Sequence, residues 1–526
     1  MQLVQLRRIS STTVSSLSTS LNLSLNHHIR NGRIADARKL FDRSQEHRDV
    51  ATWNTMISGY CKNGQIKNAQ HLFDEMPQRD VITWNTMLGG FYRSNDMENL
   101  VGCFLEMGRT GVKPTEFTLA SVISAVSETG FGVLVPQLHG NAVCLGLNSS
   151  VFVGSALIGG YTSLGGCLRS DDLRQVFDEI LAKDVTSWNA LISGYMSVGD
   201  VAEACRMFGK MPERNVVSWT CLVQGYIQNK KMDDARRGFD KMPEKNVVSW
   251  TVMISGYERN GRFEEALELF VLMLNSGVQP NEFTLSSVAS ACAGSSFLVF
   301  GRQVHSSILK TGVPTDVLLL SSLVDMYAKC GDITAAESVF ETIPEKSLPS
   351  WNSIVGGYAK HCYGTRTLEL FERMKRHGIK PDNITLVHVL TACAHGGLVE
   401  EGEAHFESMV GKFGIQPEKE HFACMVDLYG RAGELEKAKN LIKRIPFEPD
   451  IVVWGALLGA CGLHSNLEFG LFAAEEMYKL ERDHPAAYSL LSKIHGDKGE
   501  WARVVELRKM MEVGTKKQKA GSWIGA

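Results

Sequence analysis

The chain has 526 residues, a formal net charge of −3 and 44% apolar residues. A chain of this length is too long for one compact hydrophobic core. Its nearly balanced charge excludes a protein that binds nucleic acid mainly through a strongly basic surface. No long uninterrupted apolar run occurs, so the sequence predicts no membrane-spanning helix.

The N-terminal segment is basic and rich in Ser and Thr. No Asp or Glu occurs before Asp36, and Arg7 and Arg8 belong to a short amphipathic basic pattern. This composition is typical of an organellar transit peptide, and the basic amphipathic pattern favours the mitochondrion over the chloroplast. We therefore expect residues 1–17 to be a transit peptide, the alternative being an N-terminus without a targeting role.

Tryptophan recurs along the rest of the chain with nearly fixed spacing. Three gaps between successive Trp residues are 31 residues long, and the longer gaps of 101 to 104 are each about three times 34. A period of this size is typical of stacked-repeat proteins, which present a long surface in place of a single pocket. The recurring residues are Trp53, Trp84, Trp188, Trp219, Trp250, Trp351 and Trp454.

Residues 50–80 show how one repeat is built. Apolar side chains from 53 to 60 recur at intervals of three and four, which predicts one amphipathic helix, and Asn63-Gly64 ends it. A second apolar stripe over 66–76 predicts a second helix, which Pro77 blocks from continuing. One hairpin cannot bury both stripes alone, so neighbouring hairpins must stack.

Units of three kinds alternate along the chain. Copies of 31 residues end in an apolar residue and Pro, copies of 35 end in Gly-x-x-Pro, and a third kind lacks the Trp. The pattern predicts an all-α fold of about thirteen stacked helix-turn-helix repeats over residues 18–450, followed by two divergent hairpins within residues 451–526.

Four stretches carry a resemblance to a known family: WNTMISGYCKNG, DEMP, GVQPNEFTLSSVASACA and LVDMYAKCGDITAAESVF. They resemble pentatricopeptide repeat proteins of land plants, and the mixed repeat lengths are similar to the PLS subclass of that family. Tetratricopeptide repeats do not match, because their own Trp-Leu-Gly-Tyr pattern at constant length is missing. The resemblance covers residues 18–526 and implies a right-handed α-solenoid superhelix that binds single-stranded RNA, one base per repeat.

In the family that the chain resembles, the fifth residue and the last residue of a repeat read one base together. Short polar side chains at both positions can hydrogen-bond the Watson–Crick edge of a base. A helix N-capping role is the alternative for any one Asn or Thr at these positions. The resemblance implies Asn22 with Asp49, Asn54 with Asp80, and Asn352 with Asp382 for U; Asn189 with Asn215 and Asn85 with Thr115 for a pyrimidine; Thr220 with Asn246 and Thr251 with Asn281 for A; Ser155 with Asp184 for G; and Ser321 with Ser347 as a weak reader.

The copies without Trp carry Ala120, Ser286 and Val387 at the fifth position, and we expect these repeats to read little. With the N-terminus at the 5′ end of the RNA, the expected sequence is approximately U-U-Y-n-G-Y-A-A-n-n-U. The Trp rings themselves lie on the apolar stripes, so we interpret them as packing residues.

The C-terminal segment resembles the E extension of this subclass. Some members continue into a cytidine-deaminase-like domain, whose zinc needs His-x-Glu and a following CxxC. No CxxC occurs here, and His405-Phe406-Glu407 lies inside a predicted repeat helix. We therefore expect no catalytic residue, no metal and no cofactor in this chain. In the C-terminal hairpins, we expect Trp501 to contribute to packing, whereas Trp523 is left open.

The resemblance implies a specificity factor for C-to-U editing of organellar transcripts, which is not itself an enzyme. Its partners would be single-stranded organellar RNA, a deaminase of the DYW type supplied in trans and other proteins of the editing complex, with no membrane. Two alternatives stay open. One is an organellar factor for RNA splicing, stability or translation, and the other is a protein-binding helical-repeat scaffold.

Overall fold

The computed structural model describes residues 18–164, 170–311, 315–481 and 484–514. The predicted transit peptide, residues 1–17, lies outside these ranges, as does Trp523. The described residues are almost entirely helical and contain no strand. The chain divides into two compact units, Met1–Met253 and Ile254–Ala526. No helix in the described ranges is both long and apolar enough to cross a lipid bilayer.

The first unit begins with a helix over residues 18–30. Its other helices are α2 (Ile34–Arg43), η1 (Gln45–His47), α3 (Val50–Lys62), α4 (Ile66–Glu75), α5 (Val81–Arg93), α6 (Met97–Arg109), α7 (Glu116–Glu128), η2 (Gly132–Leu134), α8 (Val135–Leu145), α9 (Val151–Ser163), α10 (Ser170–Glu179), α11 (Val185–Ser197), α12 (Val201–Lys210), α13 (Val216–Gln228) and α14 (Met232–Asp240). The boundary between the units falls within α15 (Val247–Arg259).

The second unit continues the same alternation of helices. They are α16 (Phe263–Asn275), α17 (Glu282–Ser295), α18 (Leu298–Thr311), α19 (Val317–Lys329), α20 (Ile333–Thr342), α21 (Leu348–Lys360), α22 (Gly364–Arg376), α23 (Asn383–Gly396), α24 (Val399–Ser408), η3 (Met409–Phe413), α25 (Lys419–Arg431), α26 (Leu435–Ile442), α27 (Ile451–Leu463), α28 (Leu467–Leu480), α29 (Pro485–Asp497) and α30 (Trp501–Gly514).

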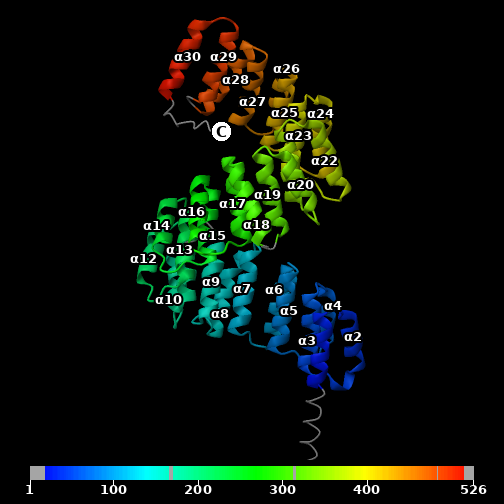
Figure 1. Cartoon of the computed structure of the whole chain (residues 1–526). Helices are drawn as coiled ribbons and strands as arrows, with labels where there is room; N and C mark the ends of the chain where they lie inside the picture. The colour runs from blue at the N-terminus through cyan, green and yellow to red at the C-terminus, as the bar shows by residue number, and fades with distance from the viewer. Residues whose placement is uncertain (1–17, 165–169, 312–314, 482–483, 515–526) are drawn as a thin grey trace, which may run out of the picture. The chain divides into compact units, whose positions relative to one another are not determined.

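Each repeat is a pair of helices, and the pairs stack in chain order within each unit (Figure 1). In residues 50–80, α3 packs against its own second helix, α4, and against the first helix of the next repeat, α5. Gly64 ends the turn after α3 in the left-handed conformation, with φ of 71°, which glycine adopts without strain. The predicted all-α fold of stacked helix-turn-helix repeats is therefore confirmed.

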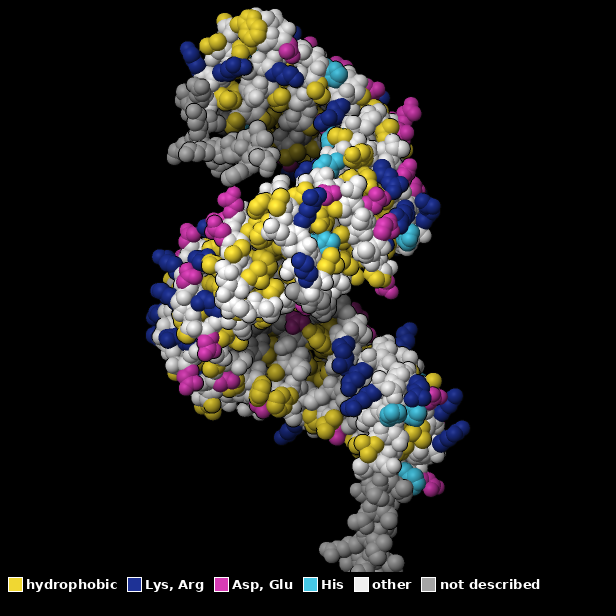
Figure 2. All heavy atoms as spheres, in the orientation of Figure 1, with side chains coloured by type: hydrophobic (Ala, Val, Ile, Leu, Met, Phe, Trp, Pro, Cys, Tyr) yellow, Lys and Arg dark blue, Asp and Glu magenta, His cyan; other side chains and the backbone are white. Residues whose placement is uncertain are grey.

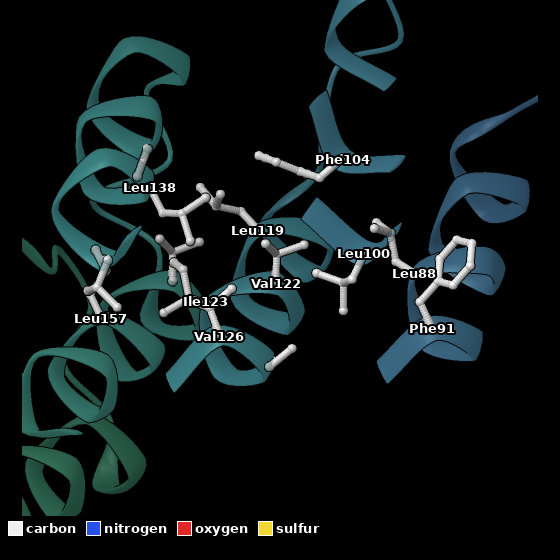
Figure 3. Close-up of a cluster of buried hydrophobic side chains, with 14 of the residues drawn as sticks. Leu88, Phe91, Leu100, Phe104, Leu119, Val122, Ile123, Val126, Leu138 and Leu157 are labelled. Carbon is white, nitrogen blue, oxygen red and sulfur yellow. The ribbon is translucent and has the colours of Figure 1, made fainter. Parts of the chain in front are cut away.

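In the first unit, one hydrophobic core runs from repeat to repeat between Leu21 and Leu222. Figure 3 shows a section of it in the first unit, where side chains of α5 to α9 interlock. Leu119, Val122, Ile123 and Val126 all come from α7 and are at most 2% exposed. A first helix is thus buried on the sides that face its own partner and both neighbours, and its remaining side is left for binding.

The recurring Trp is a packing residue, as the sequence predicts. In six repeats its ring meets, edge to face, a Phe from the second helix of the preceding repeat, with ring centroids 4.8–5.0 Å apart. Such contacts contribute about 0.5–1.5 kcal/mol each beyond area burial. A basic side chain covers the same Phe and donates to carbonyls at the end of its helix, as Arg79 does over Phe73 at 4.5 Å. The pairs are Phe41–Trp53, Phe73–Trp84, Phe177–Trp188, Phe208–Trp219, Phe239–Trp250 and Phe340–Trp351.

The last two hairpins, α27 with α28 and α29 with α30, continue the stack through a core that includes Leu457, Met477 and Ile494. Trp454 meets Phe472 of its own hairpin with ring centroids 5.5 Å apart, which departs from the arrangement in the other repeats. Trp501 is 67% exposed. The expectation that Trp501 packs is therefore wrong, because the side chain at the first position of α30 faces solvent.

Candidate nucleic-acid interface

The last residue of each repeat lies immediately before the first helix of the next repeat, and in most repeats its side chain caps that helix. The backbone N–H of Thr83 donates to Oδ1 of Asp80 at 2.8 Å, and that of Thr284 donates to Oδ1 of Asn281 at 2.9 Å. Ser347 is an exception, because its side chain makes no cap bond. The predicted last residues that act as caps are Asp49, Asp80, Thr115, Asp184, Asn215, Asn246, Asn281 and Asp382.

Capping determines which atom of the side chain remains for a ligand. A backbone N–H needs an acceptor, so the oxygen of an Asn cap must face the helix and its amide Nδ2 must point the other way. In Asn215, both the N–H and the hydroxyl of Ser218 donate to Oδ1. In Asp80, three hydrogen bonds all end on Oδ1. An Asn cap therefore presents a donor, whereas an Asp cap presents a carboxylate oxygen.

The caps Asp80 and Asp382 are acceptors because they stay ionised. Burial raises the pKa of Asp80, but the hydrogen bonds from Thr83 and Asn54 outweigh it and hold the pKa below the ordinary value of an aspartate. Asp382 follows the same balance, with burial opposed by bonds from Thr385 and Asn352. An ionised carboxylate accepts hydrogen bonds and cannot donate one.

The fifth residues lie one turn inside the first helices and therefore do not cap them. The N-capping role, which was the alternative to base reading at these positions, belongs to the last residues. Nδ2 of Asn54 donates to Oδ1 of Asp80 at 3.3 Å, and Nδ2 of Asn352 donates to Oδ1 of Asp382 at 3.0 Å. Against the effect of burial, a hydrogen bond from the side chain of Asn22 likewise lowers the pKa of Asp49. The structure therefore joins the two members of all three pairs that are expected to read U.

In other predicted pairs the fifth residue bonds to its own helix. Thr220 and Ser321 donate their hydroxyls to carbonyls of their own helices, at 2.7 and 2.6 Å. Thr251 does the same toward Val247 at 2.8 Å, and its partner Asn281 belongs to the other unit. Among the described residues no hydrogen bond joins the members of three further pairs, Asn85 with Thr115, Ser155 with Asp184, and Asn189 with Asn215.

Several fifth residues hold a buried oxygen that has no hydrogen-bond partner among the described residues. Leaving such an atom unpaired costs about 1–3 kcal/mol. Asn352 differs, because its Oδ1 accepts a hydrogen bond from the hydroxyl of Thr385 at 2.6 Å. These fifth positions are thus polar sites that the fold itself does not satisfy. The atoms are Oδ1 of Asn22, Asn54, Asn85 and Asn189, and Oγ of Ser155.

A third element of the surface was missed by the sequence analysis. The second residue of most first helices is a large apolar side chain that is more than half exposed. Large apolar side chains rarely line up on an exposed surface unless that surface binds something. The sequence could have located this position, because it stands three residues before the fifth residue in every repeat. The exposed set is Ile82, Phe117, Phe152, Val217, Val248, Phe283, Leu318, Ile384 and Val452.

Basic residues stand at the opposite end of several first helices. As the last residue of its helix each one complements the helix dipole, and each could also meet a phosphate. Lys329 is paired with Asp325 at 2.8 Å and Arg431 with Asp427 at 2.8 Å. Elsewhere on the face shown in Figure 2, acidic and basic side chains are interspersed. The terminal basic residues are Lys62, Arg93, Arg259, Lys329, Lys360 and Arg431.

The described residues contain no cluster of His, Cys, Asp and Glu that could hold a metal ion. His405, which stands in the His-x-Glu triplet, lies within α24 with its ring edge to face with Phe371 at 5.4 Å. Burial lowers the pKa of His405. The side chain is accounted for by packing.

Family models match most of the repeat tract. The model described as the PPR repeat family matches residues 79–128, 183–217, 245–294 and 346–395. Two models described as PPR repeat match residues 47–77, 217–247, 319–348 and 420–446. A model described as the E motif matches residues 464–525, which include α28, α29 and α30.

Similar proteins of known sequence come from Arabidopsis thaliana. Three pentatricopeptide repeat-containing proteins are 39%, 36% and 33% identical to this chain over 78%, 90% and 93% of its length. The matched parts make up 72%, 64% and 55% of those proteins, so the chain spans only part of their length.

Among solved structures, the chain is similar to the pentatricopeptide repeat protein PPR10 in complex with an 18-nt psaJ RNA element, at 18% identity. The TM-score is 0.43, and the match covers 94% of this chain and 80% of the other. The crystal structure of PPR10 from maize matches at 17% identity with a TM-score of 0.36.

Proposed function

Because this chain belongs to the pentatricopeptide repeat family and carries the E motif of that family, we propose that it binds single-stranded RNA and reads one base with each competent repeat. The observation that carries this proposal is the cap at the end of each repeat. The helix N-terminus fixes whether a donor or an acceptor faces outward, so a short side chain selects a base edge at little entropic cost.

The edges of the four bases match the two kinds of cap. Uracil and guanine carry an N–H on their Watson–Crick edge and suit the carboxylate of Asp49, Asp80, Asp184 or Asp382. Cytosine and adenine carry a bare ring nitrogen there and suit the amide of Asn215, Asn246 or Asn281. This agrees with the bases expected from the resemblance for each of these repeats.

The exposed apolar second residues supply the remaining part of a base site. Bases bind non-covalently by stacking on flat or apolar surfaces, which contribute about 1–3 kcal/mol per base when aromatic. Phe117 and Phe152 lie on neighbouring first helices with ring centroids 4.7 Å apart. Successive second residues therefore form a continuous apolar surface on which bases can stack, while the cap and the fifth residue meet their edges.

We infer further that the bound RNA is an organellar transcript and that binding selects a cytidine for C-to-U editing. The E motif over residues 464–525 supports this role, with the deaminase supplied by a separate protein. Two similar Arabidopsis proteins, 34% and 32% identical to this chain, are described as mitochondrial, which favours that organelle. Comparing C-to-U sites between plants with and without the protein tests this part, because an unchanged set of sites removes the editing role.

The substitution Asp80→Asn tests base reading directly. Asn caps a helix as well as Asp does, so the fold stays intact while the outward atom changes from acceptor to donor. We expect the preference at the facing nucleotide to move from uridine toward cytidine by about tenfold or more, which corresponds to about 1.4 kcal/mol. Fluorescence anisotropy with RNAs that differ only at this nucleotide measures the ratio of the two dissociation constants.

The control for Asp80→Asn is the nucleotide that faces Asn352 and Asp382, where the preference for uridine must not change. A ratio that stays the same at the nucleotide facing Asp80, in a variant with an unaltered circular dichroism melt, contradicts base reading by the cap.

A further inference from the structure

One residue departs from the repeat pattern beside the pair Asn352 and Asp382. The sixth residue of most first helices is small, whereas in α23 it is His388. The facing residue on α21 is Gly356, and a methyl group added there would lie 2.7 Å from Nε2 of His388. The imidazole therefore occupies space that the bare backbone at Gly356 leaves open. The small sixth residues are Thr55, Thr86, Ser121, Ala156, Ala190, Cys221, Val252, Ser287, Ser322, Ser353, Cys424 and Ala456, and the other two are Leu23 and Leu490.

His388 lines an open pocket of about 590 Å³ formed by α19, α21 and α23, all within the second unit. This volume is within the range of roughly 300–1,000 Å³ that is typical of small-molecule sites. Asn352 and Asp382 line the same pocket. Here the fifth residue is already ordered, because Asn352 donates to Asp382 and accepts from Thr385. The pocket is thus formed before any ligand binds.

The lining is arranged in three levels along the first helices. Asn352 lies next to the cap Asp382, and Gly356 and His388 lie one turn further along their helices. Lys360 stands one more turn on, at the end of α21. The second residues Pro349 and Ile384 flank the entrance level. A nucleotide with its base edge at the cap would place its ribose at the level of the imidazole and its phosphate near Lys360.

The ring of His388 has hydrogen-bonding capacity to offer. None of the hydrogen bonds found among the described residues ends on its nitrogens, in contrast to His395, which bonds to the carbonyl of Ala359. Burial lowers the pKa of His388, and the carboxylates of Asp382 and Asp325 oppose that shift only in part. The ring is therefore neutral at physiological pH, with one donor and one acceptor nitrogen.

We propose that this pocket binds one complete uridine ribonucleotide and that His388 hydrogen-bonds its ribose 2′-hydroxyl. The inference rests on the proposed RNA binding and adds a sugar-sensing residue to it. A 2′-hydroxyl is both donor and acceptor, and it is the group by which a protein distinguishes RNA from DNA at a given position. The position equivalent to His388 in the Asn54–Asp80 repeat is Thr86, whose hydroxyl is already used by the carbonyl of Ile82 at 2.7 Å.

The experiment replaces a single uridine by 2′-deoxyuridine in the cognate RNA and measures binding to the full chain. At the nucleotide facing Asn352 and Asp382 we expect about fivefold weaker binding, the effect of losing one hydrogen bond of about 1 kcal/mol. The variant His388→Phe keeps a ring against Gly356 and should bind both RNAs equally. If that variant does not fold, His388→Leu takes its place.

The matched control is deoxyuridine at the nucleotide facing Asn54 and Asp80, which reports the effect of the altered sugar alone and should change binding less. Equal effects at the two nucleotides in the wild-type protein, or a discrimination that persists in His388→Phe, would overturn the role of His388. Failure of the proposed base reading has a separate signature, since replacing the same uridine by cytidine would then leave binding unchanged.

Discussion

At the scale of single residues, the cap side chain joins a structural role to the recognition role that we propose for it. Thr385 illustrates the coupling, because its N–H donates to Oδ1 of Asp382 at 2.8 Å and its hydroxyl oxygen accepts from the N–H of Asp382 at 3.2 Å. The helix start thereby fixes a carboxylate that the RNA can use. Substitutions that keep the cap will separate the two roles, whereas alanine will confound them by destabilising the helix by about 0.5–2 kcal/mol.

The lowered pKa of Asp382 predicts a specific acid sensitivity. In the unfolded chain this carboxylate has the ordinary pKa of about 3.9, and folding lowers it because the bonds from Thr385 and Asn352 outweigh burial. The stabilisation is therefore fully present above that value and is lost as the pH falls through the lowered folded-state pKa. We expect the stability advantage of the wild type over Asp382→Asn to shrink between about pH 5 and pH 3.

Denaturant midpoints at a series of pH values measure this difference. The control is Asn281→Ala, which removes a cap without an ionisable group and should cost the same at every pH. An Asp382→Asn difference that stays constant from pH 7 to pH 3 would show that the carboxylate is not stabilised in the folded state.

Residues that recur could be predicted from the sequence, and a residue that occurs once could not. The phase of the Trp series placed Asn54, Asp80, Asn352 and Asp382 correctly on neighbouring helices. The orientation of the caps depends on the first residue of each helix, which periodicity locates only to within a few residues. His388 carried no periodic signal, and its meaning depends on Gly356, which lies on the preceding first helix.

At the scale of helices, close approach of successive first helices depends on a glycine near their C-terminal ends. A methyl group at Gly357 would lie 2.6 Å from the Cβ of Ala328 on the preceding first helix, and neither group can move aside easily. Gly89 stands at a helical position where an added methyl group meets nothing within 4 Å. Replacing each glycine by alanine therefore separates the effect of crowding between helices from the intrinsic preference of alanine for a helix.

We expect Gly357→Ala to lower the unfolding free energy by about 1–3 kcal/mol, as overpacking does. Gly89→Ala should be neutral or stabilising by up to about 1 kcal/mol, because alanine favours the helix more than glycine does. Thermal unfolding followed by circular dichroism compares the two variants. A stability of Gly357→Ala equal to that of Gly89→Ala would mean that successive first helices do not approach as closely as described.

The exposed apolar second residues also belong to the scale of helices. In the sequence, Ile82 and Val217 stand two positions before a Trp and are indistinguishable from the apolar stripe that the core uses. The structure separates them, because Ile82 and Val217 are more than half exposed while the residues of the apolar stripe are buried. Periodicity over one helix could not predict this, since the buried faces are defined by contacts between different repeats.

At the scale of the whole molecule, net charge decides which forces hold the RNA. With a net charge of −3, general attraction to phosphate is weak, and binding must come mainly from base contacts. Two of the six basic residues at the ends of first helices are already paired with carboxylates. Four remain without an ion pair among the described residues, namely Lys62, Arg93, Arg259 and Lys360.

The dependence of binding on salt follows from this count. Each phosphate contact to a single strand contributes about −0.7 to the slope of log K against log salt, so four contacts predict a slope near −3. Lys360→Ala should reduce its magnitude by about 0.7 and weaken binding equally for RNAs that differ in one base. Asp80→Asn should leave the slope unchanged while it alters the base preference. A slope much steeper than −4 would show that phosphate contacts outweigh the base contacts on which the proposed function depends.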